Sequence, residues 1–453
     1  MKKHHTSSSR MAVTIGLLLS VVRFYGCTPL QLIDTRVVDM RMLQRGVQAA
    51  SQDVVIVAVD DASIDKIGRW PWSRATMARL VRLVSAGEPS VIGFDVVQSE
   101  SAAAPLLRGL QDRVDGVDDE TWLRVHDALE SWSDEDQLLA DAIRDSGRVI
   151  LGYFFDFGEN PSGSTSLAVN GYGSVRESES GVGHRRLLEA KAAVGNLPIL
   201  NDATLGSGYF NVFPDPNDGL YRRLPIAVRY GDAYAMPLSV AMVRTHRGNP
   251  TAGLRFAGFG TEEVRLGSQR IPVNEDGQML LNFRGPRESF RHVAAADLLD
   301  GRIDPEVFRD KLVLVGVTAT AVADIRPIPF DGVFPGVEIH ATAIGNILRG
   351  DFLRQPKGSV LIEICAILLL ACALGLVLRY VRGVMAALAA LAFGGAYLVT
   401  TQWLFVRTGL PLGLVFPVLA IGIVYSVVSL AHFAAERGEK RQIREALGLY
   451  RSP

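Results

Sequence analysis

The 453-residue sequence has only three cysteines, and all of them lie in apolar segments, at Cys27, Cys365 and Cys372. The polar part of the chain, residues 31–356, has none and so forms no disulfide. It must be held together by a hydrophobic core, and it is long enough to bury one.

Residues 31–356 also lack common catalytic motifs and have fewer basic than acidic residues. This part contains no Gly-x-Ser-x-Gly motif, no phosphate-binding Walker loop and no dinucleotide-binding fingerprint, so we expect neither an enzyme nor a cofactor. It carries 34 basic and 44 acidic residues, a net charge of −10. A domain of this charge repels polyanions, which argues against nucleic acid as a partner.

Long apolar runs are abundant. Three follow one another near the carboxyl terminus, at residues 359–378, 383–406 and 409–433. Each has the roughly 20 residues needed to cross a hydrocarbon core of about 30 Å, and the polar breaks are short enough only for tight turns. The sequence therefore predicts a hairpin of three transmembrane helices in the lipid bilayer. Glu363 and Arg379 lie near the ends of the first one, where snorkelling toward the headgroups accounts for them.

A fourth apolar run follows the basic amino terminus, residues 1–10. The bulky Phe24 and Tyr25 stand where a signal peptidase needs small side chains, which favours a transmembrane signal anchor at residues 11–30 over a cleaved signal peptide. Excess Lys and Arg then places both termini, residues 1–10 and 434–453, in the cytoplasm. We expect residues 31–356 to lie outside a bacterial inner membrane, in the periplasm or extracellular space.

The exported part has the pattern of an α/β fold. A β-branched run at 53–59, a helical pattern at 73–86 and a second apolar run at 90–97 predict a strand, a helix and a strand joined by a parallel crossover. Alternating helical and strand patterns occur again in two later segments. They predict helices at 134–146, 293–299 and 337–348 and strands at 148–155 and 311–317. We therefore expect a mostly parallel sheet interrupted by insertions.

Three insertions are readable. Residues 158–186 are rich in Gly, Ser and Asn and predict a mobile loop, and the acidic stretch 102–132 predicts an extended, partly helical segment. Residues 253–284 alternate and carry turn signals at 267–268 and 274–277, which predict small β-hairpins.

Several blocks of sequence resemble, in order, the type 2 CHASE extracellular sensory domain. They are VDDASI at 59–64, GRWPWSR at 68–74, IGFDVV at 92–97, GYFN at 208–211 with the charged residues up to Arg223, KLVLVG at 311–316 and PGVEIHA at 335–341. The resemblance extends through the three membrane helices. It implies a membrane-bound sensor with a cytoplasmic output module, commonly a nucleotide cyclase, a histidine kinase or a serine/threonine kinase.

The end of the chain, residues 441–453, resembles the connector that precedes a class III adenylate or guanylate cyclase domain. We expect the sensor portion of such a cyclase, with no catalytic module in this chain. Ile443, Leu447 and Tyr450 fall on one helical face, which predicts a homodimer. The alternative is a membrane-tethered periplasmic ligand-binding protein or enzyme, and a third possibility is an envelope scaffold with a protein partner.

The first candidate ligand-binding residues surround a strand-to-helix junction, where ligands of α/β sheets bind. Trp70, Trp72 and Arg74 offer flat contacts and a charge there. The plainer interpretation is that the tryptophans cap the core and Arg74 pairs with an acid such as Asp95. Asp60 and Asp95 also end strands, where carboxylates either hold a cation or an amine or cap a helix.

The remaining candidates are more ambiguous. Asp218 is typical of a turn, and Arg222 is typical of a solvated charge or, less simply, part of an anion site. His340 stands two residues from Glu338 without the spacing of a hydrolytic or metal motif, so a capping role for this pair is the simpler interpretation. The ligand itself is an unknown extracytoplasmic small molecule or protein.

Overall fold

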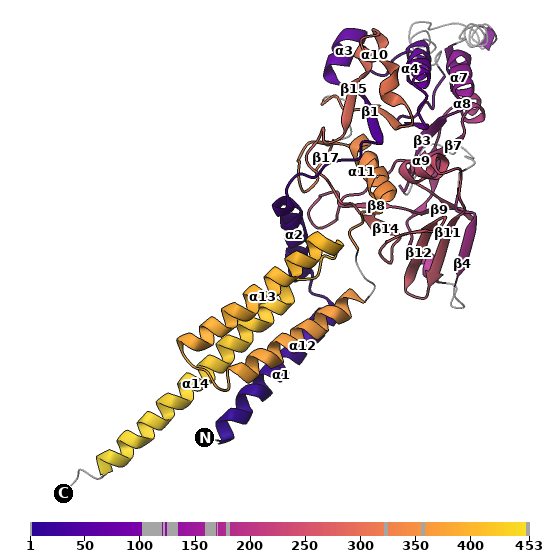
Figure 1. Ribbon diagram of the computed structural model, residues 1–453. Coiled ribbons are helices and arrows are strands. Elements are labelled where there is room, and N and C mark those ends of the chain that lie inside the picture. Colours follow the sequence, from indigo (N-terminus) through magenta and orange to yellow (C-terminus); the bar gives the residue numbers. More distant parts are fainter. Residues whose placement is uncertain are drawn as a thin grey trace. The chain divides into compact units, whose positions relative to one another are not determined.

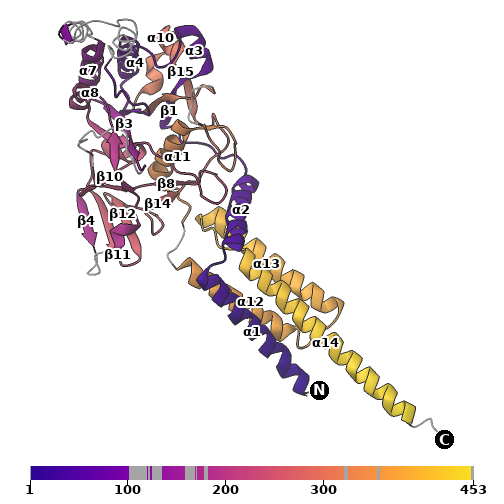
Figure 2. The same cartoon turned by 180° about the vertical axis from the view of Figure 1, so that it is seen from behind.

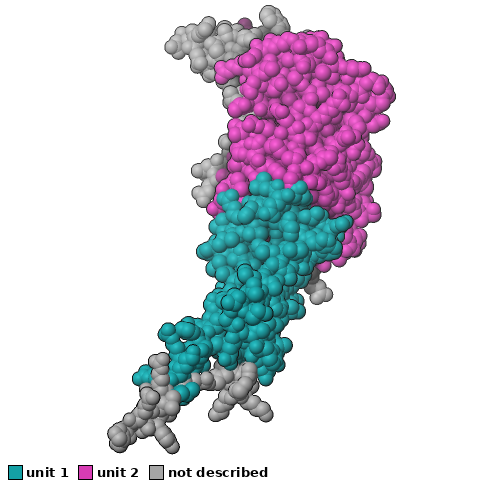
Figure 3. Space-filling view, turned by 60° about the vertical axis from the view of Figure 1, so that its left-hand side comes forward, with its two compact units in different colours: residues 1–45, 353–453 teal, residues 46–352 magenta. Residues whose placement is uncertain are grey.

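The computed structural model describes residues 2–101, 120, 123–124, 135–158, 169, 171–177, 182–320, 325–354 and 358–449. The chain forms two compact units (Figure 3). An α/β unit comprises residues 46–352, and a helical unit comprises residues 1–45 and 353–453.

The α/β unit is built on one seven-stranded sheet (Figure 1). Its parallel strands lie in the order β15 (Arg291–Ala294), β1 (Val54–Val59), β16 (Leu312–Val317), β2 (Val91–Phe94), β3 (Val149–Asp156) and β7 (Gly206–Tyr209). The short β6 (Ala192–Val194) pairs with the end of β3 in the antiparallel direction. The predicted α/β class is confirmed.

Both faces of this sheet are covered by helices, which explains why its strands are continuously apolar. Alternate residues of β1 point to opposite faces. Val55 and Val57 pack in one core with α4 (Arg74–Ala86) and α7 (Glu135–Ser146), whereas Ile56 packs in the other with α9 (Leu238–His246) and α11 (Gly336–Arg349). Figures 1 and 2 show these two helix pairs on opposite sides of β1 and β3.

The order of the strands differs from their order in the sequence. β1 and β2 belong to the strand-helix-strand unit expected from the sequence, yet β16 lies between them. The helix expected at 293–299 begins only at Ala295, because the preceding residues pair with β1 as the edge strand β15. The second half of the chain therefore completes a sheet that the first half begins.

Smaller sheets form the insertions. β4 (Ser174–Glu177), β11 (Ala252–Ala257), β12 (Gly260–Leu266) and β13 (Gln269–Ile271) make a four-stranded sheet. The hairpin turn predicted at 267–268 joins β12 to β13. The turn predicted at 274–277 forms, with the N–H of Gly277 donating to the carbonyl oxygen of Asn274 at 3.1 Å. It does not close the expected hairpin, because the following strand β14 (Gln278–Leu280) pairs with β8 (Arg223–Pro225).

The other elements of the α/β unit are short: α3 (Asp61–Ile67), α8 (Pro198–Ala203), α10 (Ala295–Leu299), the 3₁₀ helices η1 (Gly183–Arg186) and η2 (Pro305–Phe308), β5 (Glu189–Ala190), β9 (Val228–Tyr230), β10 (Ala233–Ala235), β17 (Ile325–Arg326) and β18 (Phe334–Pro335). Most of the predicted insertion 102–132 lies outside the described residues. Part of the predicted loop 158–186 does too, and its described part contains β4 and η1.

The helical unit contains α1 (Lys2–Tyr25), α2 (Thr28–Arg45), α12 (Ser359–Val377), α13 (Val384–Thr408) and α14 (Val415–Leu449). The last three are long and apolar enough to cross a membrane, and α1 with α2, bent by 84°, could make a fourth span. α14 begins six residues later than the predicted run, after a non-helical segment at 409–414.

Polar side chains hold this segment before α14. Asp34 of α2 accepts hydrogen bonds from the backbone N–H groups of Leu414 (2.8 Å) and Val415 (2.9 Å), which caps α14 from another helix. Arg41, also on α2, donates to the carbonyl oxygen of Leu412 at 2.9 Å. These contacts place α2 in the helical unit, so the α/β unit begins at Gly46 instead of residue 31.

Glu363 of α12 is part of the same arrangement. Its carboxylate forms an ion pair with Arg23 of α1 and accepts the N–H of Gly413 at 3.1 Å. The residue is 5% exposed. The snorkelling expected from the sequence is therefore wrong for Glu363, because its charge is satisfied between helices.

Candidate ligand-binding site at the carboxyl edge of the sheet

A cavity of about 130 Å³ lies where β1 and β16 end. Asp60 and Asp61 follow β1, Thr318 and Thr320 follow β16, and all four line the cavity. The carboxyl edge of a parallel sheet is where α/β folds bind ligands, because successive strands deliver their loops to the same edge.

The two aspartates also order the loops that carry them. Asp60 caps α3, with Oδ1 accepting the N–H of Ser63 at 2.9 Å. Asp61 Oδ2 accepts hydrogen bonds from both the N–H and the hydroxyl of Thr320, each at 3.2 Å. The end of β1 is thus tied to the segment after β16.

Glu338 forms the inner wall of the cavity, in the first turn of α11. It is fully buried, and its Oε1 accepts the N–H of Glu288 at 2.9 Å. Its Oε2 has no hydrogen-bond partner among the described residues. Burial raises the pKa of the Glu338 carboxyl to about 7, and the nearby charges of Glu288 and Asp331 act in the same direction.

His292 of β15 also lines the cavity, beside Glu338. Its Nδ1 lies 3.1 Å from the carbonyl oxygen of Phe290, so Nδ1 carries the proton and donates there. Nε2 is then a hydrogen-bond acceptor. It lies 3.6 Å from Glu338 Oε1 and has no hydrogen-bond partner in the described part of the chain. Burial lowers the pKa of His292, which favours the neutral ring.

A close approach between α11 and the sheet positions Glu338. Gly316 of β16 lies against Val337, and a Cβ added to Gly316 would come within 2.8 Å of the Val337 Cβ. A side chain at this position would push the start of α11 away from the strand. Glycine therefore allows the helix to bring Glu338 up to the strand ends.

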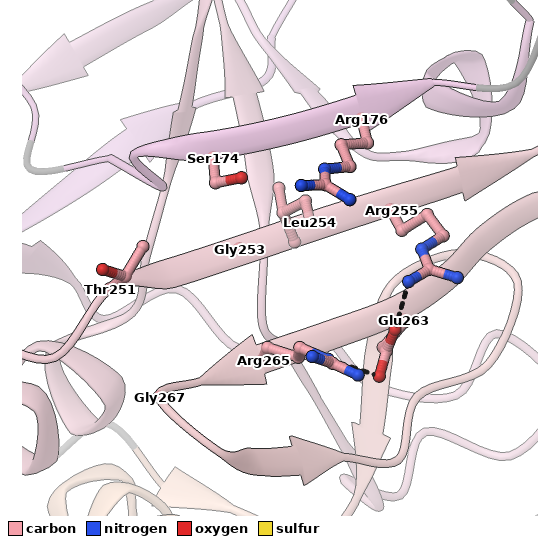
Figure 4. Close-up of a pocket in the computed structure, with 9 residues that line it drawn as sticks. All are labelled: Ser174, Arg176, Thr251, Gly253, Leu254, Arg255, Glu263, Arg265 and Gly267. Atoms are coloured by element: carbon pink, nitrogen blue, oxygen red, sulfur yellow. Dashed lines mark hydrogen bonds and ion pairs between the residues drawn. The ribbon is translucent and has the colours of Figure 1, made fainter.

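A second hollow, of about 220 Å³, lies on the sheet of β4, β11 and β12 (Figure 4). Arg255 and Arg265 both point toward Glu263 and pair with it, at 3.3 and 2.7 Å. The opposite face of this sheet packs Leu254 and Phe256 into the core. The hollow is thus the solvated face of a half-buried sheet, on which Glu263 pairs with Arg255 and Arg265.

Comparison with known families identifies the chain. A model of the CHASE2 domain matches residues 14–377. The chain belongs to the CHASE2 family. CHASE2 is an extracellular sensory domain, so the resemblance seen in the sequence is confirmed. No curated protein and no solved structure matches the chain.

Within this CHASE2 chain, the tryptophan cluster is part of the core. Trp72 is 5% exposed, and its indole N–H donates to the carbonyl oxygen of Gly68 at 2.9 Å. Trp70 packs against it edge to face, with ring centroids 5.3 Å apart. Arg74 is also buried and pairs with an acid, Asp136, at 2.9 Å, as the plainer interpretation expected. This cluster stabilises the start of α4 outside the cavity.

The other predicted site residues are also dispersed. Arg222 is not a solvated charge, because it is buried and donates to both carboxylate oxygens of Asp218, at 2.8 and 2.7 Å. His340 is buried, hydrogen-bonds the carbonyl oxygen of Phe210 at 3.2 Å, and has its pKa lowered by burial to about 4. Asp95 follows β2 and is half-buried, outside the cavity lining. Of the predicted residues, the cavity includes Asp60.

The sequence did not point to His292 or to the burial of Glu338. His292 belongs to the start of a segment predicted as a helix, and a histidine in a short edge strand has no pattern that marks it. No group of three or more His, Cys, Asp and Glu side chains within the described ranges is arranged to hold a metal ion.

Proposed function

We propose that this chain is the receptor part of a membrane-bound signalling system, and that a small extracytoplasmic ligand binds in the cavity at the carboxyl edge of the sheet. Membership in a family of extracellular sensory domains supports the first part. The observation that carries the second is that Glu338 Oε2 and His292 Nε2, on two residues that line the cavity, have no hydrogen-bond partner among the described residues. Buried polar atoms without partners are rare in folded proteins, and a ligand would satisfy them.

The proposed topology has residues 46–352 outside the cell membrane and both ends of the chain in the cytoplasm. The positive-inside rule supports it, because Arg379, Arg382 and the basic residues after Phe433 then share the cytoplasmic side. The proposed output is a nucleotide cyclase. α14 would carry the signal inward, and pairing through Ile443 would make the receptor a homodimer.

Two cysteine variants in a chain lacking Cys27, Cys365 and Cys372 test topology and pairing. Asp232→Cys lies at an exposed turn of the α/β unit, and Ile443→Cys lies on exposed α14. A membrane-impermeant maleimide is expected to label Asp232→Cys in intact spheroplasts and Ile443→Cys only after permeabilisation. Oxidation is expected to join Ile443→Cys into a dimer. Protection of Asp232→Cys in intact spheroplasts would contradict the receptor topology.

Ligand binding is tested with the full chain in lipid nanodiscs, screened against small molecules by thermal unfolding. At least one compound is expected to raise the unfolding midpoint of wild type and not that of Glu338→Gln. Glu306→Gln is the matched control, because Glu306 is an exposed glutamate outside the cavity lining. If every stabilising compound acts equally on wild type and Glu338→Gln, the cavity is not the site.

A further inference from the structure

The cavity has a surplus of hydrogen-bond acceptors and negative charge. Glu338 Oε2 and neutral His292 Nε2 accept hydrogen bonds and cannot satisfy one another, since neither has a proton to donate when the carboxyl is ionised. Asp60, Asp61 and Glu288 add carboxylates to the lining. A ligand that fits this site must therefore donate hydrogen bonds.

The basic residue of the lining does not supply that donor. Arg287 lies 3.4 Å from Asp331 and pairs with it, and its own backbone N–H donates to the same carboxylate oxygen at 3.3 Å. Its side chain is half exposed, whereas Glu338 is fully buried. The charge of Arg287 favours the ionised Glu338 carboxyl, but its effect is smaller than that of burial, so the pKa of Glu338 stays raised.

The size and the remaining walls limit the ligand. A cavity of about 130 Å³ is well below the several hundred Å³ of a typical drug-sized site, so the ligand has few heavy atoms. Ile325, Val333 and Pro335 line one part of the cavity and offer contact to carbon atoms. Most of the lining is therefore polar, with one apolar part formed by these three side chains.

We propose that the cavity binds a small organic ammonium ion, with one N–H donated to Glu338 Oε2 and another to His292 Nε2. This inference rests on the proposed receptor function and names the class of its ligand. An anion would be repelled by the carboxylates, and a neutral donor would leave the buried charge uncompensated. An ammonium ion supplies both the charge and the donors.

The test uses the full chain in lipid nanodiscs at about pH 8, in phosphate buffer, because amine buffers would themselves compete. Methylammonium chloride is expected to raise the unfolding midpoint in a saturable manner. Tetramethylammonium chloride has the same charge and no N–H, so it is expected to act like sodium chloride of equal ionic strength. This pair separates hydrogen bonding from charge alone.

Two variants test whether methylammonium binds at Glu338 and His292. Glu338→Gln is expected to weaken methylammonium binding about 10–100-fold, the loss typical of a charge-assisted hydrogen bond. His292→Leu removes an acceptor without changing the charge of the site, because the His292 ring is neutral, and it is expected to weaken binding by a smaller factor. Glu306→Gln is expected to bind as wild type does.

The outcomes distinguish the ligand class from the receptor function. Equal stabilisation by methylammonium and tetramethylammonium, or equal binding by wild type and Glu338→Gln, would overturn the ammonium site. If ammonium ions fail while another small molecule stabilises wild type and not Glu338→Gln, the ligand class is wrong and the receptor site stands. If no compound separates these two proteins, both proposals fail.

Discussion

Glu363→Ala is expected to destabilise the helical unit by about 3–5 kcal/mol, the loss typical when one partner of a buried ion pair is removed. Arg23 and Glu363 have side chains only 13% and 7% exposed, so the variant would leave the Arg23 charge buried without its carboxylate. It would also remove the acceptor for the N–H of Gly413. The segment before α14 would then lose one of its anchors.

The measurement is the fraction of full-length protein that stays monodisperse in detergent after heating, for Glu363→Ala, Arg23→Met and the double variant Arg23→Met with Glu363→Leu. The double variant is expected to recover much of the loss, because apolar side chains replace both charges. Glu436→Ala breaks an exposed pair with Lys440 and is expected to leave the heating curve unchanged. Equal damage in Glu363→Ala and the double variant would contradict a charge effect.

Glu338→Gln is expected to stabilise the ligand-free α/β unit by about 3 kcal/mol at pH 8. The pKa of Glu338 rises from its ordinary value of 4.5 to about 7 on folding, and each pKa unit corresponds to about 1.4 kcal/mol. At pH 8 the Glu338 carboxyl of the folded wild type is ionised and buried, which lowers the free energy of unfolding by this amount. Glutamine keeps the shape and the acceptor for Glu288 N–H, and it has no charge.

The pH dependence has a definite sign. Since folding raises the pKa of Glu338, the folded state binds the proton more tightly, and stability falls as pH rises from 4.5 to about 7. His340 acts oppositely, because its pKa falls from 6.5 to about 4 on folding and stability is lost as pH falls through that range. Comparing wild type with Glu338→Gln at each pH removes the contribution of His340.

Unfolding midpoints of the two full-length proteins, measured from pH 4.5 to 8, should therefore converge at the acid end, separate progressively as pH rises to about 7, and stay apart above it. Parallel curves would show that the Glu338 carboxyl titrates normally in the folded protein. A separation that closes when methylammonium is added to wild type would link this buried charge to the ligand.

The sequence predicted those strands and helices that have a regular pattern of apolar residues. The continuous apolar runs of β1 and β16, and the helical spacing in α4, α7 and α11, are local patterns imposed by a sheet covered on both faces. The position of β16 between β1 and β2 depends on pairing between distant segments. No local pattern specifies that pairing.

The site was harder to predict than the fold. Asp60 was found because it ends an apolar strand, a position that sequence can show. Glu338 was interpreted as a capping residue, and a glutamate in the first turn of a helix has the same pattern whether it is exposed or buried. Its burial depends on the close approach of Val337 to Gly316, which only the folded structure reveals.

α14 runs for 35 residues without interruption, a rod of roughly 50 Å. A stiff rod transmits two movements over its whole length, rotation about its axis and sliding along it. One inserted residue would turn everything beyond it by about 100° and advance it by about 1.5 Å, whereas seven would nearly restore the phase. The rotation of α14 about its axis, more than its amino-acid composition, would then determine which helical face of the receptor contacts the output module.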